Sequence, residues 1–413
     1  MGIDKYDYFY VDLSYKEIKM TDKETNKTDS KINPLTTLLS ITVGVTVLWK
    51  HLNWLSPYLL PSILLGIALY LFYMFVIRNR PQYKHNKYWI TVLVISVLSP
   101  IALTVNDYLD NSYRIELSEK FEKNMRILRW ITYEPTTMNP YAKRHEGLEE
   151  IKQELKIIEE NGFTGIITFS SKGDLSSIPR EAKNIGIKGV IMGIMDPTDE
   201  EELERAINES EFVDAYCVGH MFTDYDYGQG EVIYAVEKVR ESTNKPITTT
   251  LRPNGYLAFP SLTNSIDWFF PDIHTRWYTN ASVEKNFRET KYLIEKVSDV
   301  QRAYPYKPIL LKMISLPSDD AKNASPKEQF MFFRNIVEYS KSDMDFPERV
   351  YPSYFSSFDI PWKTPERKWP SGEVHVGLFD KNGKPKKFID PDSKKEISVI
   401  SAFDWVDTVQ TIE

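Results

Sequence analysis

Four aspartates stand just past predicted β-strands, where acid/base chemistry would be well placed. They form two pairs: Asp224 and Asp226 follow His220, and Asp319 and Asp320 follow Met313. Carboxyl groups held close together can exchange protons with a substrate, and the imidazole of His220 has a pKa suited to a general base. These residues could therefore build an acid/base site. Loop aspartates also cap helices or face solvent, so a purely structural role stays open.

Two segments near the C-terminus carry a recognisable pattern. One reads Phe358-Asp359-Ile360-Pro361-Trp362-Lys363, and the other reads Glu373-Val374-His375-Val376-Gly377-Leu378-Phe379-Asp380. The pattern resembles the end of the barrel in glycoside hydrolase family 17, where the chain typically reads F-x-A-F-D-E-P-W-K and then H-W-G-L-F. The resemblance extends from about Trp130 to Lys386. It implies a TIM barrel and the substrate of β-1,3-glucanases and β-1,3-glucan transglycosylases.

The resemblance also says where two catalytic glutamates belong, and both positions are substituted. The family's V-G-N-E after the fourth strand is Val218-Gly219-His220-Met221, and the glutamate before G-W-P-S on the seventh strand is Met313. Ile360 replaces the glutamate of D-E-P-W-K, and Ile167-Thr168-Phe169 replaces R-T-Y. Methionine can neither transfer a proton at neutral pH nor form a glycosyl ester. With Met221 and Met313 as degenerate positions, we expect a pseudo-glycosidase.

Further candidates for contact with a sugar stand at the ends of strands. His274-Thr275-Arg276-Trp277 matches the family's H-P-x-W after the sixth strand, and Trp362 belongs to the retained P-W-K. Each tryptophan could stack on a sugar ring or simply pack. The expected substrate-binding residues are Tyr133, His274, Trp277, Asp359 and Trp362.

Metal and cofactor motifs are not visible in the sequence. The 6 histidines show no i, i+4 pairing and no nearby cysteine, and Gly228-Gln229-Gly230 is too short for a phosphate loop. We therefore expect neither a metal nor a cofactor. Cys217 is the only cysteine, so no intramolecular disulfide can form.

The elements that must position these residues alternate along the chain from Arg126 onward. Eight short β-type runs in strict alternation with amphipathic helical runs predict an α/β protein with a (β/α)8 TIM barrel. The predicted strands are Ile127–Tyr133, Gly165–Phe169, Gly189–Met192, Ala215–Gly219, Ile247–Thr250, Trp268–Ile273, Ile309–Met313 and Tyr351–Phe358. The predicted helices are Glu146–Asn161, Ser176–Asn184, Thr198–Ser210, Gly230–Thr243, Ser282–Ser298 and Pro326–Tyr339, and the connection near Tyr256–Asn264 is only weakly helical.

Composition narrows the class of ligand. The chain of 413 residues has 51 basic and 58 acidic residues, and its net charge of -7 gives no support for nucleic-acid binding, which needs a basic face. Aromatic residues are abundant, with 9 Trp, 25 Tyr and 21 Phe. This fits a protein that handles glycans, and it equally fits ordinary packing.

Three apolar stretches in the first quarter predict a membrane segment. They run from about Leu35 to Trp49, from Tyr58 to Ile77 and from Tyr88 to Val105. A helix needs about 20 apolar residues to span a bilayer, so the second and third suffice and the first is marginal. The basic loop from Arg78 to Lys87 predicts a cytoplasmic N-terminus and an extracytoplasmic barrel. A buried helical hairpin in a soluble protein is the alternative.

The patterns together predict four regions: a cytoplasmic polar tail (1–33), a membrane segment with two or three transmembrane helices (34–106), an extracytoplasmic TIM barrel (107–390) and a C-terminal tail (391–413). They indicate a membrane-anchored barrel that binds a β-glucan-like glycan of the cell surface or envelope, or that joins a membrane or envelope protein partner in a surface assembly. An active hydrolase or transglycosylase with displaced carboxylates is the rival hypothesis. A purely structural interaction domain, without saccharide binding, is a third.

Overall fold

The computed structural model describes residues 110–137, 147–219, 227–274, 282–319, 323–342, 346–364 and 372–403. The chain divides into two compact units, Met1–Asp107 and Tyr108–Glu413, and all the described residues belong to the second. The expected tail 1–33 and membrane segment 34–106 therefore lie outside the described residues. Within the described ranges, no helix is both long enough and apolar enough to cross a bilayer.

A curled parallel β-sheet lies at the centre of the second unit. Its seven strands follow the order β5-β4-β3-β2-β1-β7-β6, so strands that are consecutive in the chain are mostly neighbours in the sheet. Their bounds are β1 (Trp130–Thr132), β2 (Gly165–Ile167), β3 (Gly189–Ile194), β4 (Ala215–Val218), β5 (Ile247–Thr248), β6 (Ile309–Ile314) and β7 (Val350–Tyr354). The predicted α/β class with a parallel sheet is confirmed.

The segment 267–273 lies between the two edge strands, β5 and β6. On one side Asp267 N donates to Ile247 O (2.8 Å), and on the other Leu310 N donates to Phe269 O (2.9 Å). These hydrogen bonds join the two edges into a ring. The segment makes only isolated bridges, so the strand predicted at Trp268–Ile273 is not a regular strand. Pro271 accounts for this, because proline has no N–H to donate to the ladder.

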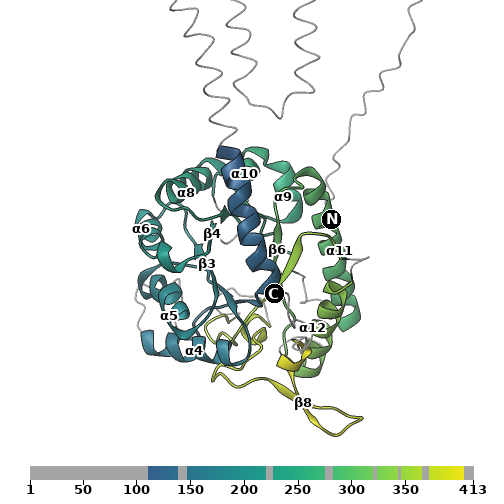
Figure 1. Ribbon diagram of the computed structural model, residues 1–413. Coiled ribbons are helices and arrows are strands. Elements are labelled where there is room, and N and C mark those ends of the chain that lie inside the picture. Colours follow the sequence, from purple (N-terminus) through teal and green to yellow (C-terminus); the bar gives the residue numbers. More distant parts are fainter. Residues whose placement is uncertain are drawn as a thin grey trace, which may run out of the picture. The chain divides into compact units, whose positions relative to one another are not determined.

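Helices surround the sheet (Figure 1). Their bounds are α4 (Leu148–Glu160), α5 (Ile178–Ile185), α6 (Glu200–Asn208), α8 (Gln229–Ser242), α9 (Pro253–Ala258), α10 (Pro260–Ser265), α11 (Val283–Ala303) and α12 (Pro326–Ser340). The weakly helical connection thus forms two short helices, α9 and α10, each with proline at its first position, where a missing N–H costs nothing. Asp199 caps the N-terminus of α6, because its side chain accepts hydrogen bonds from Glu201 N and Glu202 N.

The inner face of the sheet is packed with large apolar side chains at its N-terminal end. Trp130 is fully buried there and lies against two glycines. A Cβ atom added at Gly165 or at Gly189 would come within 2.6 Å of the Trp130 ring. These positions therefore accept no side chain without displacing the tryptophan. The inner cluster contains Trp130, Ile167, Ile191, Ala215, Cys217, Trp268, Phe270 and Leu310, with Phe121 and Met125.

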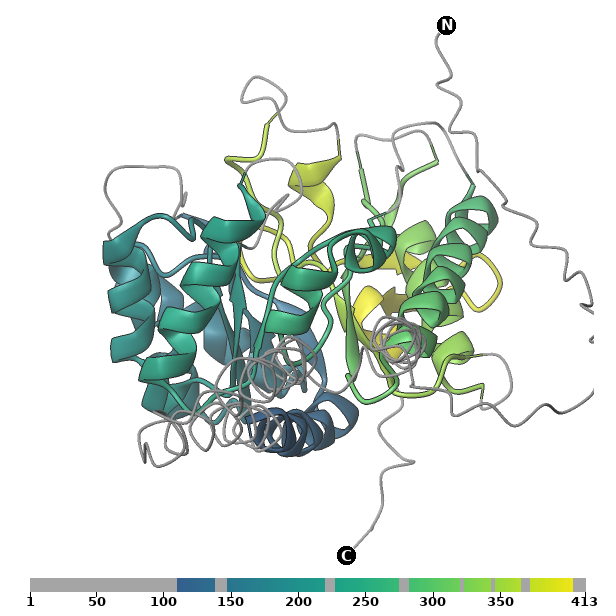
Figure 2. The ribbon, with the colours of Figure 1, turned by 90° about the horizontal axis from the view of Figure 1, so that it is seen from above.

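The helix 110–127 covers the N-terminal end of the strands. Phe121 contacts the rings of Trp130 and Trp268, with centroids 6.1 Å and 5.2 Å away. Figure 2 shows this dark blue helix at one end of the strands and the yellow-green chain after β7 at the opposite end. Ile127 belongs to this helix, so the first strand begins later than predicted. The covered end is closed, and chemistry is left to the other end.

Arg114 attaches this helix to the chain before β6, so the effect of removing the Arg114 side chain on stability can be measured. Its Nε donates to the buried Asp267 carboxylate (2.7 Å), and its Nη2 donates to the carbonyls of Asn264 and Ile266. We expect Arg114→Met to lower the free energy of unfolding by about 1–2 kcal/mol, because Arg240 still pairs with Asp267. Urea denaturation measures this. The control Arg302→Met, at an exposed ion pair, should change it by less than about 0.5 kcal/mol; equal losses would contradict the anchoring role.

Beyond β7 the chain continues to pack on this unit. The strands β8 (Lys387–Ile389) and β9 (Glu396–Ser398) form an antiparallel hairpin. After it, the Phe403 ring lies 4.6 Å from that of Tyr354 and 5.7 Å from that of Phe163, centroid to centroid. Of the predicted C-terminal tail (391–413), the structure describes residues 391–403, in which β9 pairs with β8 and Phe403 packs on Tyr354 and Phe163.

Candidate functional site

Six titratable side chains gather at the C-terminal ends of the strands, and we name them the mouth cluster. They come from the chain just after β1, from the end of β6, from the bridging segment 267–273 and the residue after it, and from the chain after β7. The cluster consists of Glu134, Asp272, His274, Lys312, Lys363 and Glu373. Between 2% and 6% of Glu134, Lys312, Lys363 and Glu373 is exposed. Charges this deeply buried need partners, so their arrangement indicates what the site can do.

Glu134 and Lys363 form a buried ion pair across the mouth. Thr132 points to the inside of the ring, and alternation along the chain from β1 gives Glu134 the same direction. Lys363 reaches Glu134 Oε2 with its Nζ atom, from the loop after β7. The same Nζ lies 4.9 Å from the ring centroid of Phe355. The carboxylate and the ammonium therefore meet in an aromatic environment that strengthens their attraction.

Lys312 and Asp272 are paired neighbours in the sheet. An isolated parallel bridge joins them, so their side chains share a face. Lys312 N donates to Pro271 O, and Ile273 N donates to Lys312 O, which holds both residues in register. Burial is the main effect that lowers the pKa of the Lys312 amine. The carboxylates of Asp272 and Glu134 raise this pKa, and the nearby Lys363 lowers it further. The site thus brings a second lysine beside a second carboxylate.

Glu373 is the buried acid of the cluster. It begins a short 3₁₀ turn, Glu373–His375, after Gly372 adopts a φ of 93°. Burial raises the pKa of Glu373 to about 7, while Lys363 opposes this and Glu134 and Asp272 add to it. Its buried Oε2 has no hydrogen-bond partner among the residues described. A carboxyl group in this state is protonated in mildly acidic solution and can donate a proton.

His274 lies beside Asp272 with its pKa lowered, mainly by burial. Lys312, Lys363 and Arg252 lower it further, whereas Asp272 raises it. The backbone N–H of His274 donates to Asp272 Oδ1 (2.9 Å). The histidine predicted as a sugar contact is thus part of the mouth cluster. Its lowered pKa favours the neutral imidazole at neutral pH.

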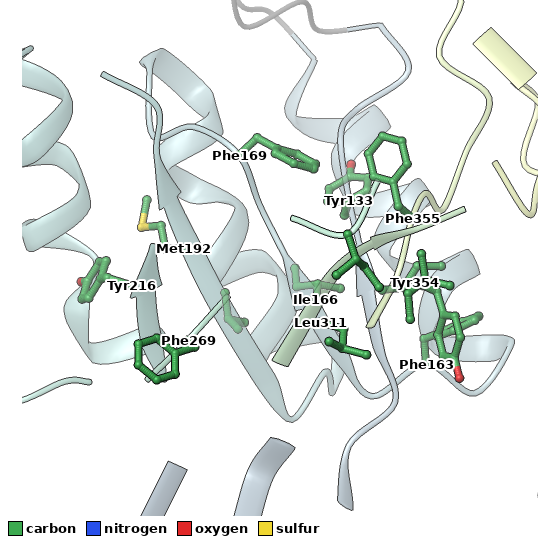
Figure 3. Packing of buried hydrophobic residues seen from close by; sticks show 14 of the residues in the cluster. Tyr133, Phe163, Ile166, Phe169, Met192, Tyr216, Phe269, Leu311, Tyr354 and Phe355 are labelled. Atoms are coloured by element: carbon green, nitrogen blue, oxygen red, sulfur yellow. The ribbon is translucent and has the colours of Figure 1, made fainter. Parts of the chain in front are cut away.

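Aromatic rings line the cluster. The rings of Phe169 and Phe355 stand edge to face, with centroids 6.0 Å apart, and Figure 3 shows both near the ends of their strands. The ring centroid of Trp362 lies 5.4 Å from Lys363 Nζ, and 8% of Trp362 is exposed. Its contact with a sugar stays a prediction.

Two other predicted binding residues point elsewhere. Tyr133 is 1% exposed, and its hydroxyl donates to Glu154 on α4 (2.8 Å), because its neighbours Thr132 and Glu134 take the inner face. Asp359 is occupied in joining chain segments, since its Oδ1 accepts from Gly377 N (3.1 Å) and Lys386 Nζ (2.7 Å). Neither side chain is left to present its polar group to a sugar, contrary to expectation.

The position expected for the nucleophile is Met313 at the end of β6. Its φ of 69° is unusual for a residue other than glycine, and the pairing of β6 with β7 shifts between Leu311 and Ile314. The other predicted catalytic positions lie outside the described residues: His220, Met221, Asp224 and Asp226, together with Trp277 and Asp320. Asp319 is described and exposed.

Sequence reasoning overlooked five members of the mouth cluster: Glu134, Asp272, Lys312, Lys363 and Glu373. Two signals were available, and neither covered Asp272. Glu134 and Lys312 each adjoin a residue singled out at a strand end, and Lys363 and Glu373 lie inside the quoted C-terminal motifs. What could not be read from the chain is that these residues meet.

Across the parts of the chain that the structure describes, no group of three His, Cys, Asp or Glu side chains is arranged to hold a metal ion.

No protein-family model matches the chain, and no curated protein matches it. An endo-laminarinase from Formosa Hel1_33_131 is similar in structure, with 16% identity over 62% of this chain and 84% of that one and a TM-score of 0.47. The β-1,3-glucanase and allergen of Cryptomeria japonica pollen has 13% identity over 62% of this chain and 97% of that one, at a TM-score of 0.49.

A GH2 β-galacturonidase from Eisenbergiella tayi has 13% identity over 63% of this chain and a TM-score of 0.46. The chain spans about half of that protein, with 48% of it covered. These structural neighbours are glycoside hydrolases with TIM-barrel-like folds. TM-scores below 0.5 separate neither families nor substrates.

Proposed function

We propose that the chain is a membrane-anchored (β/α)8 barrel that binds a β-glucan-like glycan of the cell surface or envelope at the mouth cluster. In this proposal it does not hydrolyse the glycan by the mechanism of the family it resembles. The observation that carries the proposal is the buried Glu134–Lys363 pair beside Phe355 and Trp362. Fixed polar groups next to aromatic rings are typical of sugar-binding sites.

The residue at the expected nucleophile position supports binding without the family's reaction. Met313 has no group that can attack an anomeric carbon or carry a proton. Its unusual φ lies near the end of β6, and its neighbour Lys312 is the residue that shares the inner face with Leu310. A site built this way can hold a glycan while lacking the family's covalent step.

Binding is tested on the full chain in detergent by calorimetric titration with laminarihexaose, with cellohexaose for comparison. We expect laminarihexaose to bind, and Trp362→Ala to weaken it about fivefold to tenfold through loss of stacking. Tyr292→Ala, on the exposed face of α11, is the matched control and should leave the affinity unchanged. An unchanged affinity in Trp362→Ala would remove Trp362 from the site. Absence of binding to every saccharide would favour the interaction-domain hypothesis.

A second function rests on Glu373. A protonated Glu373 lies near Asp272 and near Glu134, which is ion-paired with Lys363. This arrangement provides one proton donor and two carboxylates, and hydrolysis of a glycosidic bond requires a general acid and a second carboxylate. Chromatography of the sugar after the same titration distinguishes the two functions. Cleavage products that vanish in Glu373→Gln would establish displaced carboxylates, and intact sugar supports binding alone.

A further inference from the structure

The amine of Lys312 is the strongest nucleophile that the mouth cluster could offer. Its side chain enters the ring from β6, on the same inner face as Leu310. The Nζ atom lies 6.0 Å from the ring centroid of Phe169 and 5.9 Å from that of Phe270. Only 3% of the residue is exposed. The amine is therefore held between two rings at the ligand end of the sheet.

Burial inside the ring favours an uncharged amine, whereas the faces of the two aromatic rings by themselves attract an ammonium. Burial is the largest effect that lowers the pKa of Lys312, and the nearby Lys363 ammonium adds to it. The groups that oppose it are Asp272 on the bridging segment, Cys217 on β4 and Glu134 after β1. A lysine desolvated among apolar groups and close to a second cation is the usual arrangement for attack on a carbonyl carbon.

Lys307 provides a contrast within the same protein. It is also buried, and burial lowers its pKa to about 7. Its Nζ, however, donates to Thr263 O (2.6 Å) and Ile266 O (2.5 Å), at the opposite end of the strands from the mouth. Through these two hydrogen bonds Lys307 holds the backbone of residues 263–266 in place. Lys312 instead stands beside carboxyl groups that can transfer protons.

We propose that Lys312 binds small aldehydes covalently as a Schiff base, including the open-chain form of a reducing sugar end. The inference goes beyond the proposed glycan binding, because it requires only an aldehyde and no polysaccharide. It rests on the placement of the amine between Phe169 and Phe270, with Asp272 paired beside it in the sheet.

The reaction balances with groups present at the mouth. The Lys312 nitrogen forms a bond to the carbonyl carbon as the C=O π bond breaks, and one amine proton passes through Asp272 to the resulting alkoxide, which gives the carbinolamine. Glu373 then protonates the hydroxyl, which leaves as water while the nitrogen lone pair forms the C=N bond, and the remaining proton on nitrogen returns to the Glu373 carboxylate. One amine and one aldehyde thus yield one imine and one water, without an oxidant or reductant.

The test traps the imine in the full chain. The protein is incubated at pH 7 with D-glyceraldehyde and sodium cyanoborohydride, which reduces the imine to a stable secondary amine, and peptides are mapped by mass spectrometry. We expect Lys312 to be labelled at least about tenfold faster than exposed Lys387, because about a thousandth of an ordinary lysine is uncharged at pH 7. Lys307 should stay unlabelled despite its lowered pKa.

Lys312→Met should abolish the fast label, and its melting temperature shows whether it is folded. The wild-type peptide map decides the question even if that variant does not fold. Labelling confined to exposed lysines, or faster labelling at Lys307 than at Lys312, would overturn the proposal. Since no glycan is present, a failure here is separate from a failure of laminarihexaose to bind.

Discussion

Lys363→Met is expected to lower the free energy of unfolding by about 3–5 kcal/mol at pH 8, more than any other single change at the mouth. The substitution removes the partner of Glu134 and leaves a carboxylate that is 6% exposed beside Asp272 and Glu373. A buried charge without its counter-ion costs this much in other proteins. Urea denaturation of the full chain at pH 8 measures the loss.

The double variant Glu134→Gln/Lys363→Met separates the pair from simple packing loss. It removes both charges, so it should be far more stable than Lys363→Met alone, and the two single losses should exceed the double loss by more than about 1 kcal/mol. Additive losses would mean that the two groups are not coupled. Lys387→Met, at an exposed ion pair with Glu396, is the matched lysine control and should have little effect.

Glu373→Gln is expected to remove the pH dependence of stability that Glu373 imposes. The folded protein holds the Glu373 proton up to about pH 7, whereas the unfolded chain releases it near 4.5. The carboxyl group therefore favours the folded state at low pH, and this advantage disappears as the pH rises through 7. Relative to the variant, the wild type should lose about 2–3 kcal/mol between pH 5 and pH 8.

The measurement compares the free energies of unfolding of wild type and Glu373→Gln at several pH values. Taking the difference between them cancels the other titrating groups that both proteins share. Glu396→Gln, in an exposed pair on the hairpin, is the control and should give a flat difference. A flat difference for Glu373→Gln would mean that this carboxyl group is ionised throughout, and the hydrolase alternative would lose its proton donor.

The sequence predicted the sheet and its helices well because the signals for them are local. Apolar runs of strand length and helical periodicity located each of the seven strands and six main helices within a few residues. The exception is the run 268–273, where apolar residues indicated a strand but Pro271 leaves only isolated bridges. Its place between β5 and β6 follows from hydrogen bonds to residues some 20 and 40 positions away, which no local pattern contains.

The candidate site was harder to predict for a physical reason. Alternation decides which side chains face the inside of the ring, and a shift of one residue exchanges them. Tyr133 was chosen at the end of β1, yet its neighbour Glu134 takes the inner face. At β6 attention likewise fell on Met313, whereas Lys312 is the residue paired with Asp272.

The sequence by itself determined the parallel α/β architecture, because this follows from residue type and short-range order, and it has Met221 and Met313 at the positions where the family resemblance predicts glutamates. Only the tertiary structure decided which charges act together. Glu134, Asp272 and Lys363 are far apart in the chain and meet because the edges of the sheet are joined through segment 267–273. Closure of the ring also removes these charges from water, and burial, not residue type, raises the pKa of Glu373 and lowers that of Lys312.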